Sequence, residues 1–159
     1  MDDILAIILK DTYSLTQYKH RLTAMKTHLL QVFFGGGQNE TLSTQDSIWV
    51  KSFPPNFYKQ FNKDNVYDIF SGLESRISHL QILTIYLTFE PDEITLIQLG
   101  QAARTTFGFP TLILDIKLNP NLIAGTALSW KGRLRDYSLK ARLEEKRVEI
   151  AQGFRRFLR

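Results

Sequence analysis

The chain has 159 residues, of which 43% are hydrophobic and 23% charged, proportions typical of a folded globular protein and not of a disordered one. It contains no cysteine, which excludes disulfide bonds, thiolate catalysis and cysteine-bound zinc. The net charge is +4 and no long apolar run or basic leader pattern occurs near the start, so we expect neither a signal peptide nor a membrane span.

The positive charge is concentrated in residues 138–159. This stretch carries seven basic and three acidic side chains, which accounts for the whole net charge of +4. A basic helix can bind nucleic acid, lie on a membrane surface, face an acidic protein partner or simply be solvated. Charge alone leaves these alternatives open.

Residues 1–79 begin with the periodicity of an amphipathic helix. Apolar side chains recur at steps of 7, 3, 4, 3, 4 and 3 residues, which places them on one side of a helix: Ile8, Leu15, Tyr18, Leu22, Met25, Leu29 and Val32. Ser14 followed by Gln17 is a capping-box pattern, so we expect the main helix to begin there and residues 2–10 to form a separate short helix.

Two breaks and a second amphipathic helix complete the first half. The stretch 33–41 contains three consecutive glycines and predicts a loop; no strand precedes it and no Gly-Lys-Ser/Thr follows, which argues against a phosphate-binding loop. Pro54 and Pro55 break the chain again. The next helix carries its inner side chains at Val66, Ile69, Phe70, Leu73, Ile77 and Leu80. We therefore predict a small helical bundle over residues 1–79.

The apolar period changes near residue 80, from that of helices to that of strands. Residues 81–89 alternate, with Leu83, Ile85, Leu87 and Phe89 on one face. Pro91 at the first helical position opens a helix through Leu96, Leu99 and Ala103 that stops at Gly108. Residues 111–118 alternate again, with Leu112, Leu114, Ile116 and Leu118 inward. A strand, a helix and a strand of these lengths predict a parallel crossover.

The remaining residues predict two more strands and a basic helix. Asn119 and Pro120 turn the chain, strands at 123–130 and 133–137 flank a Lys-Gly turn, and one helix follows. Gly125 inside a strand pattern indicates a bulge or the close approach of another backbone. Asp136 and Ser138 can each accept a hydrogen bond at the start of the helix. The predicted class is α+β, with a β-α-β-β-β-α unit over residues 80–159.

The order of residues in this block resembles a known family. Its members, the delta subunits of F-type ATP synthases and the mitochondrial oligomycin-sensitivity-conferring proteins, carry Asp-Pro-x-Leu-Ile-Gly-Gly, a hairpin, Asp-Gly-Ser and a basic helix with Arg-Leu. The matching residues here are Pro120, Leu122, Ile123, Gly125, Asp136, Ser138, Arg142 and Leu143, and the resemblance covers about residues 80–150. Asn119, Ala124 and Tyr137 depart from the pattern, so the corner before the helix need not use a left-handed residue.

The resemblance implies a non-catalytic stator subunit. The family's N-terminal six-helix bundle is longer than residues 1–79 and grips N-terminal helices of the alpha subunits, while its C-terminal domain holds the end of the b-subunit stalk. For this chain that implies a reduced bundle, no cofactor and no small-molecule substrate. It also implies a peripheral position, through the complex, on the cytoplasmic face of the bacterial inner membrane.

Apolar side chains on helices are the candidates for these contacts. For the stalk we select five residues in the final helix: Leu143, Ile150, Phe154, Phe157 and Leu158. For the alpha subunits we select the helices that carry Ile4, Leu5, Ile8, Val66, Ile69 and Phe70. The alternative for the two phenylalanines is that both fold back onto their own sheet.

Two other functions remain open. Lys131, Arg133, Arg135 and the basic helix beside Trp130 and Tyr137 would suit a nucleic-acid-binding protein. A small enzyme would need a pocket in which several titratable groups converge. His20 and His28 lie eight residues apart and His79 is isolated, so none suggests a metal site, and Trp49 and Trp130 suit a core or its rim.

Overall fold

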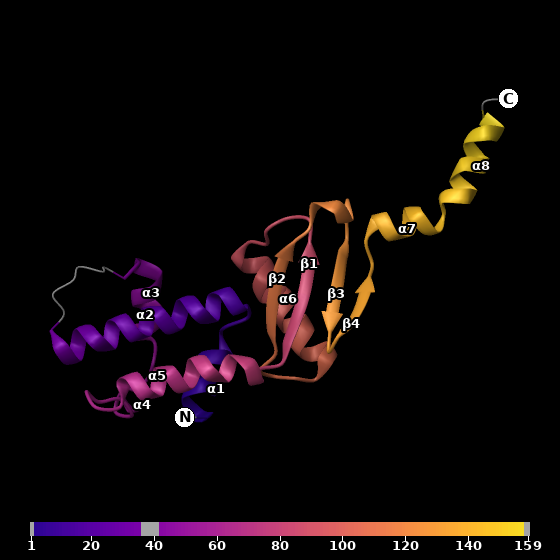
Figure 1. Ribbon diagram of the computed structural model, residues 1–159. Helices are drawn as coiled ribbons and strands as arrows, with labels where there is room; N and C mark the ends of the chain where they lie inside the picture. Colours follow the sequence, from indigo (N-terminus) through magenta and orange to yellow (C-terminus); the bar gives the residue numbers. More distant parts are fainter. Residues whose placement is uncertain (1, 36–41, 158–159) are drawn as a thin grey trace.

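The protein is described by a computed structural model that covers residues 2–35 and 42–157. It confirms the α+β class: helices come first, and a four-stranded mixed sheet with interspersed helices follows (Figure 1). No helix in these two stretches is both long enough and apolar enough to cross a bilayer.

The first half folds into helices, and the N-cap of the longest one is as predicted. They are α1 (Asp2–Lys10), α2 (Leu15–Phe34), α3 (Thr44–Lys51), α4 (Pro55–Tyr58), α5 (Val66–Ser75) and the 3₁₀ helix η1 (Arg76–His79). The predicted start of α2 is confirmed, because the Ser14 side chain accepts a hydrogen bond from the Gln17 amide at 3.1 Å. Gly35 ends α2 in the left-handed conformation, and the rest of the predicted glycine loop, at 36–41, lies outside the described residues.

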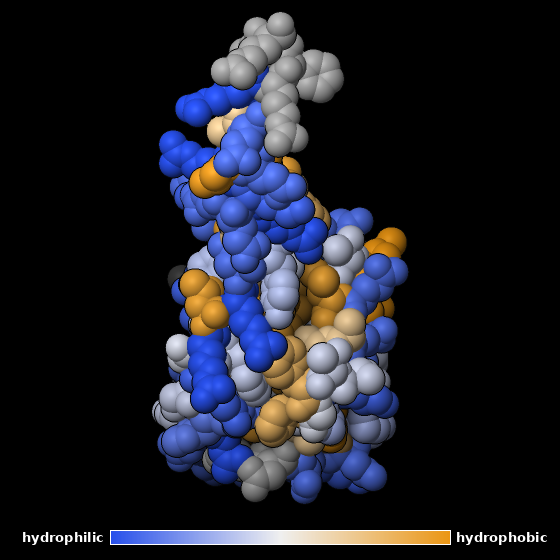
Figure 2. All heavy atoms as spheres, turned by 90° about the vertical axis from the view of Figure 1, so that its right-hand side faces the viewer, coloured by the Kyte–Doolittle hydropathy of each residue, from blue (hydrophilic) through white to orange (hydrophobic). Residues whose placement is uncertain are grey.

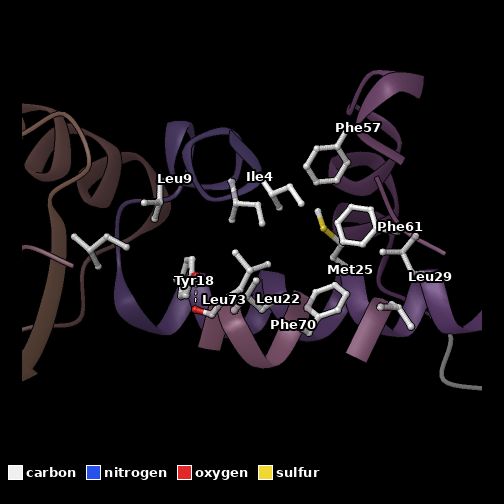
Figure 3. Close-up of a cluster of buried hydrophobic side chains, with 13 residues drawn as sticks. Ile4, Leu9, Tyr18, Leu22, Met25, Leu29, Phe57, Phe61, Phe70 and Leu73 are labelled. Carbon is white, nitrogen blue, oxygen red and sulfur yellow. Dashed lines mark hydrogen bonds between the residues drawn. The ribbon is translucent and has the colours of Figure 1, made fainter. Parts of the chain in front are cut away.

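A core of aliphatic and aromatic side chains holds these helices together (Figure 3). Its centre is the inner face of α2, against which α1, α5 and the segment around Phe57 and Phe61 pack. The buried Tyr18 hydroxyl donates to the Leu73 carbonyl at 3.1 Å and so ties α2 to α5. Val32, predicted on the same face, is 63% exposed, because Leu29 and Phe33 occupy the inner side of that end of the helix.

The second half is a sheet with one helix across a face. Strands β1 (Ile82–Leu87), β2 (Ile113–Leu118), β3 (Thr126–Trp130) and β4 (Arg133–Asp136) lie in the order β2-β1-β3-β4. The predicted parallel pairing of the first two strands is confirmed. Helix α6 (Glu93–Phe107) joins them and covers a second core, to which Leu83, Ile85, Leu87, Leu112, Leu114 and Ala103 contribute.

Several predicted boundaries in this half are wrong. Pro91 precedes α6 instead of opening it, because Asp92 is the N-cap and accepts from the Thr95 amide at 2.8 Å. Phe89 and Leu118, predicted inward, are 55% and 56% exposed, since they lie at and beyond the strand ends, past the edge of the second core. The strand predicted from 123 begins only at Thr126.

The predicted final helix is two helices, α7 (Leu139–Glu145) and α8 (Arg147–Phe157). Lys146, with φ −96° and ψ 8°, leaves helical geometry and ends α7. In Figure 1 these two helices project from the sheet as an arm, which we call the C-terminal arm.

The helical half and the sheet half are interlocked. Ile113 in β2 is fully buried in the core of the helices, not in that of the sheet. The Arg104 guanidinium on α6 donates to the carbonyls of Leu9 at 2.8 Å, Lys10 at 3.1 Å and Thr12 at 2.6 Å, and so caps the end of α1. It also lies 4.6 Å from the centre of the Tyr13 ring, which packs against Gly100. A packed interface therefore joins the two halves.

Candidate partner-binding surfaces

The motif residues build the corner from which the C-terminal arm leaves the sheet. Gly125 has φ +86°, and a Cβ placed there would lie 2.8 Å from the Tyr137 carbonyl oxygen. The predicted close approach of another backbone is therefore confirmed, and glycine is the residue that permits it. Tyr137 itself is not left-handed, as its departure from the family pattern allows.

The predicted polar caps are also present at this corner. Ser138 is fully buried, and its side chain accepts from the Ala141 amide at 3.2 Å as the N-cap of α7. Asp136 accepts from the Ser138 amide at 2.8 Å. Hydrogen bonds from the Ser138 side chain and backbone lower the pKa of the Asp136 carboxyl. These two residues fix the direction in which α7 starts.

Ile123 occupies a strained turn in the same motif. Its φ of 67° and ψ of −57°, with the Ala124 amide bonded to the Leu122 carbonyl at 2.8 Å, form a γ-turn that a β-branched residue rarely adopts. Leu122 is buried beneath it, while Ile123 is 59% exposed. Pro120 opens the 3₁₀ turn η2 (Pro120–Leu122), against which α7 packs. Part of the motif thus folds the corner, and Ile123 remains on the surface.

The C-terminal arm carries exposed apolar side chains among charged ones. Leu139, Leu143, Ile150 and Phe154 are 41%, 42%, 38% and 67% exposed. Arg142, Lys146, Arg147 and Arg155 are also exposed, and Figure 2 shows the arm as mainly hydrophilic with hydrophobic side chains between. Phe154 does not fold back onto the sheet. The side chain of Phe157 and all of Leu158, both predicted stalk contacts, lie outside the described residues.

The residues selected for alpha-subunit contact lie mainly in the core. Ile4, Ile8, Val66 and Phe70 are at most 2% exposed, and only Leu5 and Ile69 keep part of their surface. The four buried side chains stabilise the bundle and are therefore not accessible to a partner.

The basic group suited to nucleic acid is partly engaged within the fold. The Lys131 ammonium lies 5.4 Å from the ring centres of both Trp130 and Phe109. Trp130 itself packs against Phe107 and Phe109, with centroids 4.9 and 5.7 Å apart, which is the predicted rim position. Arg133 and Arg135 lie on the fully exposed strand β4.

A hollow of about 460 Å³ between α2 and α3 brings titratable groups together. The His20 ring nitrogen lies 2.9 Å from Asp46 Oδ1, and the Ser43 hydroxyl donates to Asp46 Oδ2 at 2.5 Å. Serine, histidine and aspartate are the residue types of a nucleophilic triad. In a triad the histidine contacts the serine, whereas here the carboxylate does, so the arrangement does not activate Ser43 as a nucleophile. Ser43 also accepts from the Asp46 amide as the N-cap of α3, which is a structural role.

Other charged side chains near this hollow are also tied to the fold. Arg21 donates to the Asp11 carbonyl at 2.5 Å and to Thr12 Oγ1 at 2.9 Å, and it lies 4.8 Å from the centre of the Trp49 ring. Burial lowers the pKa of Arg21 and also that of His28, which packs edge-on against Tyr58. Within the described residues, no group of three metal-binding side chains occurs.

Two features of the structure have no strong signal in the sequence. The break at Lys146 lacks a glycine or proline, and the role of Arg104 depends on carbonyls more than ninety residues earlier in the chain. Only the tertiary fold brings such groups together.

Comparison with known proteins agrees with the predicted resemblance. The chain is 29% identical over 101 residues to the ATP synthase subunit delta of Lactobacillus delbrueckii subsp. bulgaricus. The match covers 61% of this chain and 56% of the bacterial subunit, so it extends over little more than half the length of that protein. No family model matches the chain.

Proposed function

We propose that the chain is a stator subunit of a rotary F-type ATP synthase, which links the catalytic head to the membrane sector and resists the torque of the rotor. The similarity to an ATP synthase delta subunit carries this proposal. A stator catalyses nothing, and the proposed role needs no cofactor, small-molecule substrate or nucleic acid. Its location is peripheral, on the cytoplasmic face of the bacterial inner membrane.

The C-terminal arm is the proposed contact with the b-subunit stalk. Ile150 and Phe154 are four residues apart and therefore share one side of α8, and both are exposed. Burying a large apolar side chain at an interface contributes about 1.5–3 kcal/mol, whereas an exposed ion pair contributes about 0–1 kcal/mol. We therefore expect Phe154 to be a stronger anchor than Arg155 beside it, with Leu143 on α7, Phe157 and Leu158 extending the contact.

The outer sides of α1 and α5 are the proposed contact with the alpha subunits. Leu5 and Ile69 keep part of their surface there, and Tyr67 is 54% exposed on α5. The bundle is small beside that of the family, so we expect this contact to be smaller than the corresponding one in the family.

Binding to the C-terminal segment of the cognate b subunit tests the proposed stalk contact. We expect Phe154→Asp to weaken binding at least about tenfold, because a charge replaces an apolar anchor. Val148→Asp is the matched control: Val148 is 70% exposed on the same helix but lies about 120° away around its axis. Equal binding by both variants, at unchanged helicity, would refute the stalk contact at Phe154.

The nucleic-acid alternative has its own assay. Retention on a duplex or single-stranded oligonucleotide that weakens steeply with salt, and that requires Arg133 and Arg135, would favour it. The stator proposal predicts no such retention at physiological salt.

A further inference from the structure

Strand β2 forms one edge of the sheet, and the chain pairs with only the start of it. The Leu114 amide donates to the Tyr13 carbonyl at 2.8 Å, and Ser14 forms an isolated parallel bridge with Leu114. The pairing stops there because Ser14 is the N-cap of α2, which turns the chain away from the sheet. Figure 1 shows β2 as the strand nearest to α2.

The second half of this edge has backbone groups directed outward. Ile113 and Asn119 donate inward, to the carbonyls of Gln81 and Leu87. Because alternate residues of a strand direct their amides to opposite sides, the amides of Ile116 and Leu118 point away from β1, as the Leu114 amide does. No residue in the described part of the chain accepts from the amides of Ile116 and Leu118. An extended segment can satisfy these groups, whereas a helix cannot, because its own backbone is already bonded.

A hollow of about 480 Å³ lies beside these unpaired groups. Its apolar lining is Pro91, Leu96, Ile116 and Leu118, and its polar lining is Ser14, Thr16, Gln17, His20 and Glu90. Leu118 is 56% exposed. The hollow therefore offers room for side chains of a segment that pairs with the strand.

The free charge at this groove is negative. His20 is paired with Asp46. Arg21 donates to the Asp11 carbonyl and to Thr12 Oγ1, and its positive charge interacts with the carboxylates of Asp11, Glu93 and Asp46. Glu90 lines this hollow and forms no ion pair within the described residues. Lys117, the one basic residue of β2, is paired with Asp115 at 3.5 Å. A basic segment complements this arrangement.

We propose that the edge of β2 at Ile116 and Leu118 is a docking site for an extended, basic segment of another protein, which adds to the sheet as a further strand. The proposal goes beyond the stator function and is independent of it, because it rests on the sheet edge and not on the C-terminal arm. The segment supplies carbonyls to the two amides, an apolar side chain to the hollow and a basic side chain to Glu90.

The test uses the full chain and a short blocked peptide in which valine and lysine alternate. We expect the peptide to bind with a Kd on the order of 0.1 mM, as suits a short strand addition, and to slow hydrogen exchange at the Ile116 and Leu118 amides at least about tenfold. Replacing its lysines by glutamate is expected to weaken binding about tenfold. Methylating the peptide amides on its pairing edge is expected to abolish binding.

Two variants of Leu118 separate the backbone from the side chain. Leu118→Pro removes the outward amide but leaves the donors that bond to β1, a substitution that edge strands tolerate. Leu118→Ala keeps the amide and removes only the apolar side chain. We expect the proline variant to lose binding and the alanine variant to retain most of it. In both, the NMR signals of the amides that pair β1 with β2 should be unchanged.

Three results would overturn the proposal. One is the absence of binding by the wild-type chain at millimolar peptide. Another is equal binding by the unmodified and the amide-methylated peptides, a comparison in which the protein itself is unaltered. The third is concentration-dependent self-association that Leu118→Pro abolishes, which would assign the edge to a second copy of the chain. None of these results bears on the proposed binding to the b subunit, which is tested separately.

Discussion

Gly125 is the residue of the family motif whose replacement tests the corner most simply. Gly125→Ala introduces a Cβ at φ +86° and 2.8 Å from the Tyr137 carbonyl oxygen. Gly108→Ala is the matched control, because Gly108 has φ +71° and an added Cβ meets nothing within 4 Å. We expect each to lose about 1 kcal/mol of unfolding free energy from backbone strain, and Gly125→Ala to lose about 1–3 kcal/mol more. Urea denaturation measures both, and equal losses would contradict the close approach.

Tyr18 makes the stability of the helical half sensitive to alkaline pH. Burial raises the pKa of its hydroxyl from 10.0 to about 12, and the nearby Glu74 carboxylate adds to the shift. Because the pKa of Tyr18 is higher in the folded protein, its neutral hydroxyl makes its full contribution to the free energy of unfolding below pH 10.0. This contribution is lost as the pH rises through about 12.

Tyr18→Phe removes both this titration and the hydrogen bond to Leu73. We expect the variant to lose about 1–2 kcal/mol at about pH 8, since the buried Leu73 carbonyl is left without its donor. The difference from the wild type should narrow at about pH 11, where the wild-type hydroxyl begins to ionise at a cost. Unfolding free energies at both pH values provide the test, and a constant difference would contradict it.

At the scale of elements, we expect the hydrogen bonds of Arg104 to be the main polar contact between α6 and the end of α1. Lysine at this position keeps the charge but replaces a planar group that donates to several carbonyls by a single ammonium. We predict that Arg104→Lys lowers the free energy of unfolding by about 2–3 kcal/mol, measured in urea. Arg135→Lys on the exposed strand β4 is the control and should change it by less than about 0.5 kcal/mol. Similar losses in both variants would contradict the capping role.

Elements with a strong local signal could be predicted from the sequence. Ser14 and Gln17 mark the start of α2, Gly108 marks the end of α6, and the Lys-Gly pair marks the hairpin between β3 and β4. Each signal depends on residues within one turn. Pro91 and Asp92 both favour a helix start, and the hydrogen bond from the Thr95 amide to the Asp92 side chain decides between them.

The surfaces were harder to predict because exposure depends on packing between distant elements. The periodicity that places Ile4, Ile8, Val66 and Phe70 on helix faces does not say whether those faces meet the chain's own core or a partner. The same holds for Phe154, which lies exposed on the C-terminal arm. The unpaired edge of β2 leaves no local pattern, since it follows from where Ser14 turns the chain.

At the scale of the whole molecule, the interlocked halves suit the proposed role of a link that carries force. Ile113 lies in the core of the helices while its neighbours Leu112 and Leu114 lie in that of the sheet. A force applied to the sheet is therefore transmitted to the bundle through packed side chains and the Arg104 hydrogen bonds, not through a flexible linker. The C-terminal arm extends from this body (Figure 1), and several of its apolar side chains are exposed.

In the proposed stator role, the chain joins the catalytic head of an ATP synthase to its stalk, and a bridging experiment tests this role. Purified head, the soluble segment of the cognate b subunit and the full chain are mixed and sedimented together. We predict that the b segment sediments with the head only when the chain is present, and that Phe154→Asp releases the segment while the chain stays on the head. If the amount of b segment that sediments with the head is the same with and without the chain, the chain does not link the two.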